Sequence, residues 1–196
     1  MTHNGDPSGS GDWPRFEQLV LPHLDAAYNL ARWLTRNDQD AQDVVQDASM
    51  RALRYVGGVR GEQARAWWMA IVRHTCFDWL QANRPAEVVP LDDDDAQPEL
   101  AAPAGDEPQA IAVRNADRAQ LNRAIAALPV AYREVLVLRE LEDLPYKDIA
   151  RIADIPVGTV MSRLARARGL LRQALSPATR PMLHAVARPA AGKGAS

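Results

Sequence analysis

The stretch of sequence that decides the fold runs from Pro145 to Leu175 and reads PYKDIARIADIPVGTVMSRLARARGLLRQAL. Pro145 suits the first turn of a helix, where its missing N–H group costs little, and it predicts a short helix over 146–153. The segment Asp154-Ile155-Pro156 then breaks this helix and predicts a tight turn. A second, longer helix follows over 157–175. Two helices joined by so short a turn are typical of a helix-turn-helix unit.

The second helix of this unit has one apolar face and one basic face. Thr159 or Gly158 can cap its start. Its inner stripe has four residues at helical spacing, namely Val160, Leu164, Ala167 and Leu171. The opposite face carries Ser162, Arg163, Ala165, Arg166, Gly169 and Arg172, with Arg168 toward its edge. Such a helix can enter a major groove, where arginine pairs with phosphates or guanine edges. The alternative is a solvated charged face, but the short break, the small Ala150 and the basic helix occur together and favour DNA contact.

The rest of the chain also has apolar residues at helical spacing, and no alternating strand pattern stands out. The predicted helices are one over 14–34 with a kink or break at Pro22, one from Asn37 or Asp38 to Gly57-Gly58, one over 62–83 that ends ahead of Pro85, one over 108–128 and one over 130–141. We therefore expect an all-α protein.

Charge is unevenly distributed along the chain. The formal net charge of −2 hides a neutral stretch, an acidic segment with eight acidic residues and no lysine or arginine, and a C-terminal part with eleven basic against seven acidic residues. The acidic segment has four prolines and few large apolar residues, so it cannot bury enough surface to order itself. These shifts predict a disordered N-terminus over 1–12, a helical domain over 13–85, a flexible acidic linker over 86–110, a helix-turn-helix domain over 111–176 and a disordered tail over 177–196.

Two faces of the N-terminal domain carry candidate binding residues. Asp43 and Asp47 are four residues apart with Gln46 beside them, so they share an exposed face that suits a basic partner helix or is simply solvated. The helix over 62–83 is rich in aromatic residues, which can stack on unpaired bases but should mostly be core. Its expected core stripe is Trp68, Val72, Cys76 and Leu80. Its candidates for contact with a nucleic-acid strand are Arg73, His74, Thr75 and Asp78.

Taken together, these stretches resemble the extracytoplasmic-function (ECF) family of RNA polymerase sigma factors, within the sigma-70 family. The segment LNRAIAALPVAYREVLVLRELEDL (121–144), continued by the helix-turn-helix, is similar to the family's promoter-binding fourth region. The segment AYNLARWLTRNDQDAQDVVQDASMRAL (27–53) is similar to its polymerase-binding region, and ARAWWMAIVRHTCFDWLQANRP (64–85) to its −10 recognition region. The resemblance covers about residues 14–175.

The resemblance implies a division of labour among these residues. The β′ subunit of core RNA polymerase would bind the surface around Asp43, Gln46 and Asp47, and the β subunit of the polymerase is a further implied partner. Flipped bases of the −10 promoter element would be captured near Arg73, His74, Thr75 and Asp78, although His74 stands where the family usually has asparagine. The −35 element would be read by Thr159, Ser162, Arg163 and Arg166. A cognate anti-sigma factor is a further implied partner, and the acidic linker would thread through the polymerase as a nucleic-acid mimic or as an extended spacer.

Other kinds of chemistry find no support in the sequence. The four histidines lack metal-ligand spacing, the single Cys76 cannot form an internal disulfide, and there is no phosphate-binding or dinucleotide-binding glycine pattern. No stretch approaches the roughly 18 consecutive apolar residues that cross a bilayer, and the N-terminus lacks the features of a secretory signal. We expect a cytoplasmic protein that is not an enzyme and uses no metal, cofactor or small-molecule substrate.

Two other functions remain as alternatives at this point. A stand-alone helix-turn-helix regulator would bind duplex DNA by itself, but no dimerisation element is evident beyond the C-terminal unit. A decoy that binds only protein is disfavoured by the four arginines of the last helix.

Overall fold

The computed structural model describes residues 12–88 and 111–176, and within these ranges all regular structure is helical, as predicted. The α-helices of the N-terminal part are α1 (Asp12–Val20), α2 (Leu24–Thr35), α3 (Asp38–Tyr55) and α4 (Ala64–Asn83). Its 3₁₀ segments are η1 (Leu21–His23), η2 (Val56–Gly58), η3 (Gly61–Gln63) and η4 (Pro85–Glu87). The C-terminal part consists of α5 (Ile111–Ala127), α6 (Val130–Leu136), a π-helical turn η5 (Val137–Leu141), α7 (Tyr146–Ala153) and α8 (Val157–Leu175).

The first helical stretch is interrupted at Pro22. The helix predicted over 14–34 is divided into α1 and α2 by η1, which contains Pro22 and lacks the N–H group that a continuing helix needs at that residue. The start of α3 is fixed by Asn37, whose side-chain oxygen accepts hydrogen bonds from the backbone N–H groups of Gln39 (2.8 Å) and Asp40 (3.1 Å). This confirms Asn37 as the cap.

Helix α4 runs through the centre of the N-terminal core. The predicted stripe of this helix is confirmed, because all four of its members are fully buried: Trp68, Val72, Cys76 and Leu80. The helix begins at Ala64 after a 3₁₀ turn, slightly later than predicted, and ends at Asn83 ahead of Pro85. Burial also raises the pKa of the Cys76 thiol, so this cysteine is an unreactive core residue at neutral pH.

The helix-turn-helix is formed by α7 and α8 with the predicted bounds. Between them the backbone of Asp154 adopts a left-handed conformation with φ of 53°, which aspartate tolerates better than most residues. Three members of the predicted inner stripe of α8 are buried, namely Val160, Leu164 and Ala167, and the fourth, Leu171, is half-buried. The apolar face of α8 therefore lies where the 3.6-residue period placed it.

The prediction for the start of α8 was wrong in one respect. The helix begins at Val157, its cap is Pro156, and no side chain caps it. Thr159 lies inside the first turn, and its carbonyl oxygen accepts a hydrogen bond from Ser162 at 3.1 Å. The fixed φ angle of Pro156 sets the entry into the helix, so a hydroxyl cap at Thr159, three residues later, is not needed.

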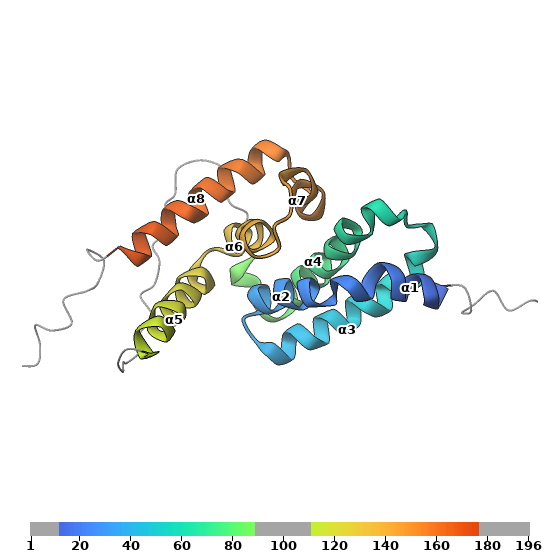
Figure 1. The fold of residues 1–196 in the computed structure, drawn as a ribbon, viewed down its shortest axis with the longest axis horizontal. Helices are drawn as coiled ribbons and strands as arrows, with labels where there is room; N and C mark the ends of the chain where they lie inside the picture. The colour runs from blue at the N-terminus through green and yellow to red at the C-terminus, as the bar shows by residue number, and fades with distance from the viewer. Residues whose placement is uncertain (1–11, 89–110, 177–196) are drawn as a thin grey trace, which may run out of the picture.

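The two parts of the chain pack against each other and share one core. Figure 1 shows α6 and α7 next to α2 and α4, and α4 contacts α7 while α2 contacts α6. The buried residues of α2, α3 and α4 are continuous with those of the C-terminal part, which include Val135, Leu138, Ile149 and Leu164. The flexible linker predicted between the two parts gave no reason to expect this contact.

Some predictions fall on segments that the structure does not describe. These are residues 1–11 of the N-terminus predicted over 1–12, residues 89–110 of the linker predicted over 86–110, and the tail over 177–196. The first residues of the predicted linker are described, and Pro85–Glu87 form η4 rather than flexible chain. Among the described helices, none has the length and apolar character needed to span a bilayer.

Candidate nucleic-acid interface

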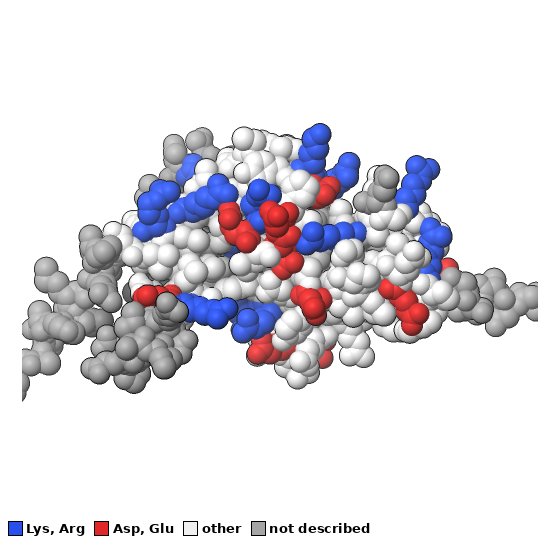
Figure 2. Space-filling view, viewed as in Figure 1, with Lys and Arg blue, Asp and Glu red and all other residues white. Residues whose placement is uncertain are grey.

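The outer face of α8 carries the side chains predicted to meet duplex DNA. Figure 2 shows lysine and arginine side chains gathering along this helix. Ser162 and Arg166 are exposed, whereas Thr159 and Arg163 are half-buried. Arg168 pairs with Glu140 at 2.6 Å, so its charge is partly neutralised within the C-terminal part. The structure thus brings the four predicted residues into successive turns of one helix, with Ser162 and Arg166 the most accessible.

The residues predicted to contact an unpaired strand lie on successive turns of α4, but not on one face. His74 and Asp78 are exposed, and Asp78 pairs with Arg51 of α3 at 2.7 Å. Thr75 is buried, and its hydroxyl donates a hydrogen bond to the backbone oxygen of Ile71 at 2.9 Å. The expectation that Thr75 lies on the surface was wrong, because its place three residues after Val72 puts it on the buried stripe of the helix.

Arg73, the fourth of these residues, is turned toward the C-terminal part. Its Nε donates a hydrogen bond to the carboxylate of Glu134 on α6, and its guanidinium lies 4.4 Å from the centroid of the Phe77 ring. The Arg73 side chain is 15% exposed and the Glu134 side chain is fully buried. In this arrangement the charge of Arg73 is neutralised by the other half of the molecule.

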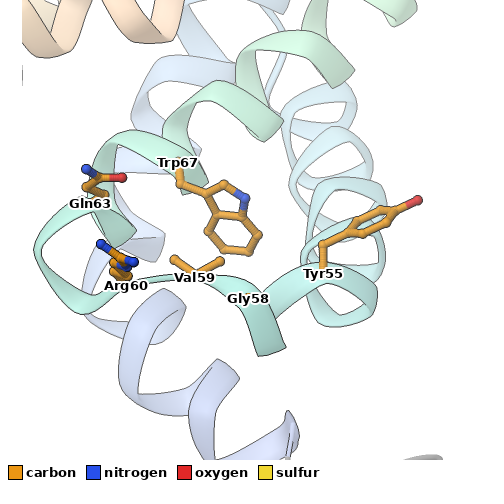
Figure 3. Close-up of a pocket in the computed structure, with 6 residues that line it drawn as sticks. All are labelled: Tyr55, Gly58, Val59, Arg60, Gln63 and Trp67. Carbon is orange, nitrogen blue, oxygen red and sulfur yellow. The ribbon is translucent and has the colours of Figure 1, made fainter.

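A shallow pocket lies beside α4, where the end of α3 and the two following 3₁₀ segments meet it. Its volume is about 430 Å³, and its lining residues are Tyr55, Gly58, Val59, Arg60, Gln63 and Trp67. Figure 3 shows the Trp67 indole over Val59, with Arg60 and Gln63 on one side and Tyr55 on the other. A flat aromatic ring next to an amide and a guanidinium can stack on a base and hydrogen-bond to its edge.

The predicted acidic face of α3 is present on the surface. Asp43, Gln46 and Asp47 are all exposed. Asp43 accepts a weak hydrogen bond of 3.4 Å from Gln39 one turn earlier in the same helix. The three side chains are therefore available to a partner without any rearrangement of the core.

Several residues of these surfaces were not predicted from the sequence. The pocket was missed because it is built from separate segments, although the Gly57-Gly58 break and Trp67 were visible signals. Arg133 and Glu134 were missed because charged residues are usually exposed, yet both are buried on α6. Arg133 donates to the backbone oxygen of Ala126 at 2.6 Å, and burial lowers the pKa of Arg133 to about 10. The apolar run around these two residues was the signal that could have shown their burial.

Within 12–88 and 111–176, no group of three histidine, cysteine or acidic side chains is placed to hold a metal ion. The predicted polar side chains are instead distributed over three helices, with a basic face on α8, exposed polar residues on α4 and an acidic face on α3.

Comparison with protein families and with relatives gives a consistent result. Residues 19–85 match the family described as sigma-70 region 2, and residues 118–171 match sigma-70, region 4. The chain is 35% identical to the RNA polymerase sigma-H factor of Pseudomonas aeruginosa over 175 residues, covering 87% of this chain and 91% of the relative. It is 32% identical to the ECF RNA polymerase sigma-E factor of Escherichia coli K12 over 176 residues, with the same coverage of 87% and 91%.

Solved structures share the fold. The sigma factor RpoE, in complex with the anti-sigma factor NepR from Bartonella quintana, aligns with a TM-score of 0.61 and 24% identity over 82% of this chain and 96% of that one. CnrH, in complex with the cytosolic domain of CnrY, aligns with a TM-score of 0.60 and 23% identity over 84% of this chain and 90% of that one.

Proposed function

Because this chain belongs to the ECF family of RNA polymerase sigma factors, we propose how its surfaces divide the work of promoter recognition. The chain directs promoter-specific transcription initiation, and its family regulates initiation rather than catalysing a reaction. The polymerase makes the new bonds, while this protein supplies binding and strand separation. It acts in the cytoplasm, where the polymerase binds DNA.

The observation that carries the proposal is the separation of three groups of polar side chains onto three helices. The acidic face of α3, with Asp43, Gln46 and Asp47, is the docking surface for the β′ subunit of core polymerase. A helix face with two exposed carboxylates one turn apart complements a basic partner helix.

The −35 element is read by the outer face of α8. Ser162 and Arg166 reach base edges or phosphates in the major groove, and Thr159 and Arg163 support them from the first turns of the helix. The N-terminal residues of a recognition helix lie nearest the base edges, and all four residues belong to the first half of α8.

The −10 element is held by α4 and the pocket beside it. His74, Asp78 and, once freed, Arg73 contact the separated strand, while Thr75 supports the helix from within. One unstacked base enters the pocket, stacks on Trp67 and is read by Gln63. An aromatic wall with polar neighbours fits a base, because a base has a flat face for stacking and polar edges for hydrogen bonds.

We also infer that a cognate anti-sigma factor controls the chain. The sigma factor RpoE, which shares this fold, was solved in complex with the anti-sigma factor NepR. Such a partner could act by covering the same surfaces on α3, α4 and α8.

The proposal is tested by size-exclusion chromatography of the purified chain mixed with sigma-free core RNA polymerase. We expect co-elution with the polymerase, and weak or no binding to promoter-length duplex DNA alone. Failure to co-elute, together with tight binding to DNA alone, would contradict the assignment of the α3 surface and favour a stand-alone regulator.

Replacing Arg166 by alanine is expected to weaken use of a promoter selected with the wild-type holoenzyme. If Arg166 contacts a base edge, the loss amounts to about 1–3 kcal/mol of binding. The measurement is holoenzyme affinity for the selected promoter and for promoters with changed −35 bases. Arg172→Ala is the matched control, because Arg172 is also exposed on α8 but lies near its C-terminal end. Equal losses for the two variants would remove Arg166 from base recognition.

A further inference from the structure

The contact between the two parts contains a buried carboxylate, that of Glu134. Glu134 on α6 is fully buried and accepts a hydrogen bond from Arg73 Nε of α4. Burial raises the pKa of Glu134, and the nearby positive charges of Arg73, Arg163 and His74 act in the opposite direction. These three residues come from both surfaces that we assign to DNA, the −10 surface on α4 and the −35 surface on α8. A single carboxylate therefore lies in the electrostatic field of both.

The other charged contacts between the two parts involve different residues. Glu142 at the end of η5 accepts a hydrogen bond from Asn29 at 2.6 Å and lies 3.7 Å from Arg65. Arg133 lies 3.5 Å from Glu87 in η4. None of these residues belongs to a proposed DNA surface. Glu134 differs because its partner is Arg73, a residue of the proposed −10 surface.

The hydrogen bonding of Glu134 is incomplete within the described residues. Its Oε2 is buried without a hydrogen-bond partner in the described chain, and the same holds for Nε of Arg163. A buried polar atom without a partner is unfavourable, so the closed arrangement carries a penalty that opening relieves. Removing one member of a buried ion pair is nevertheless unfavourable, because it leaves the other charge buried and uncompensated.

We propose that Glu134 is a latch that holds the free chain closed, by occupying Arg73 as a DNA phosphate would. In the closed state α4 and α7 are in contact, and the charge of Arg73 is unavailable to a nucleic-acid strand. Binding to polymerase separates the two parts, breaks the Arg73–Glu134 pair and frees both surfaces for the promoter. The assignment of Arg73 and Arg163 to DNA rests on the proposed function, whereas the existence of the latch does not.

The latch is tested by measuring the distance between spin labels on the two parts of the full chain, without polymerase or DNA. Labels are attached at Met50→Cys on α3 and Leu175→Cys on α8, two exposed positions. The native thiol of Cys76 is fully buried and stays unlabelled. We expect one narrow distance in the otherwise wild-type chain, and a longer and broader distribution in Glu134→Gln.

A second variant approaches the same contact from the other side. Arg73→Met removes the partner of Glu134 without changing α6, so it also broadens the distance even if Glu134→Gln were to disturb the C-terminal fold. Glu140→Gln is the matched control, because Glu140 is an exposed residue that pairs with Arg168 inside the C-terminal part. The same narrow distance in Glu134→Gln and Arg73→Met as in the control would overturn the proposal.

A binding measurement then tests the consequence for DNA. Glu134→Gln should bind a short random-sequence duplex about tenfold more tightly than the wild-type chain, within the 5–150-fold range usual for coupling between sites. Unchanged affinity in a variant that has opened would overturn the role of the latch in guarding the DNA surfaces. Because the distance measurement needs neither DNA nor polymerase, its result stands whatever the co-elution experiment decides about the proposed function.

Discussion

Replacing Asp43 and Asp47 together by lysine is expected to abolish co-elution with core RNA polymerase while leaving the fold intact. Both carboxylates are exposed on α3, and the wild-type and variant helices each place like charges one turn apart, so repulsion within the helix is similar. At the interface with a basic helix the reversal turns attraction into repulsion, which costs several kcal/mol. We expect an affinity loss of more than about a hundredfold, since each 1.4 kcal/mol is about tenfold.

The control for this variant carries the same change in net charge elsewhere on the N-terminal part. Glu17→Lys with Asp25→Lys reverses two exposed acidic residues on α1 and α2. This control should co-elute with the polymerase nearly as the wild-type chain does. Circular dichroism and thermal unfolding show whether each variant is folded. A folded Asp43→Lys, Asp47→Lys variant that still co-elutes would remove the acidic face of α3 from the polymerase interface.

The helices could be predicted from the sequence because each has local signals for its period and its ends. Asn37 caps α3, Pro85 follows the end of α4, and the turn at Asp154 separates α7 from α8. These signals depend on backbone chemistry within a few residues, so they need no knowledge of the tertiary structure. The all-α class and the helix-turn-helix are confirmed for the same reason.

The contact between the two parts could not be predicted in this way. Arg73 belongs to a polar face of α4, and nothing in its own helix indicates that a glutamate 61 residues away would pair with it. Glu134 was not singled out from the sequence, because a charged residue is rarely fully buried unless it is paired. Its burial follows from the packing of α6 between both halves, which is a long-range property of the fold. The burial of Thr75 has a local cause instead. A small polar residue can lie on a buried stripe when its hydroxyl donates a hydrogen bond to the preceding turn.

Alanine substitution of the two adjacent tryptophans of α4 should affect different properties, stability for one and promoter opening for the other. Trp68 is fully buried in the shared core, whereas Trp67 is half-buried and lines the pocket. Trp68→Ala should lower the free energy of unfolding by about 3–5 kcal/mol, because it removes a large buried ring and leaves a cavity. Urea unfolding measures this loss, and a domain of ordinary stability would then be close to unfolding.

Trp67→Ala should instead leave most of the stability and impair promoter opening. The stacking of one base on an aromatic ring contributes about 1–3 kcal/mol, so open complexes formed with core polymerase should decrease by a corresponding factor. The permanganate reactivity of unpaired thymines in the −10 element measures this decrease. Trp67→Phe is the control that keeps a stacking surface and should restore most of the opening. If Trp67→Ala opened promoters normally while remaining folded, the pocket would not hold a base, and recognition of the −10 element would depend on the exposed residues of α4 alone.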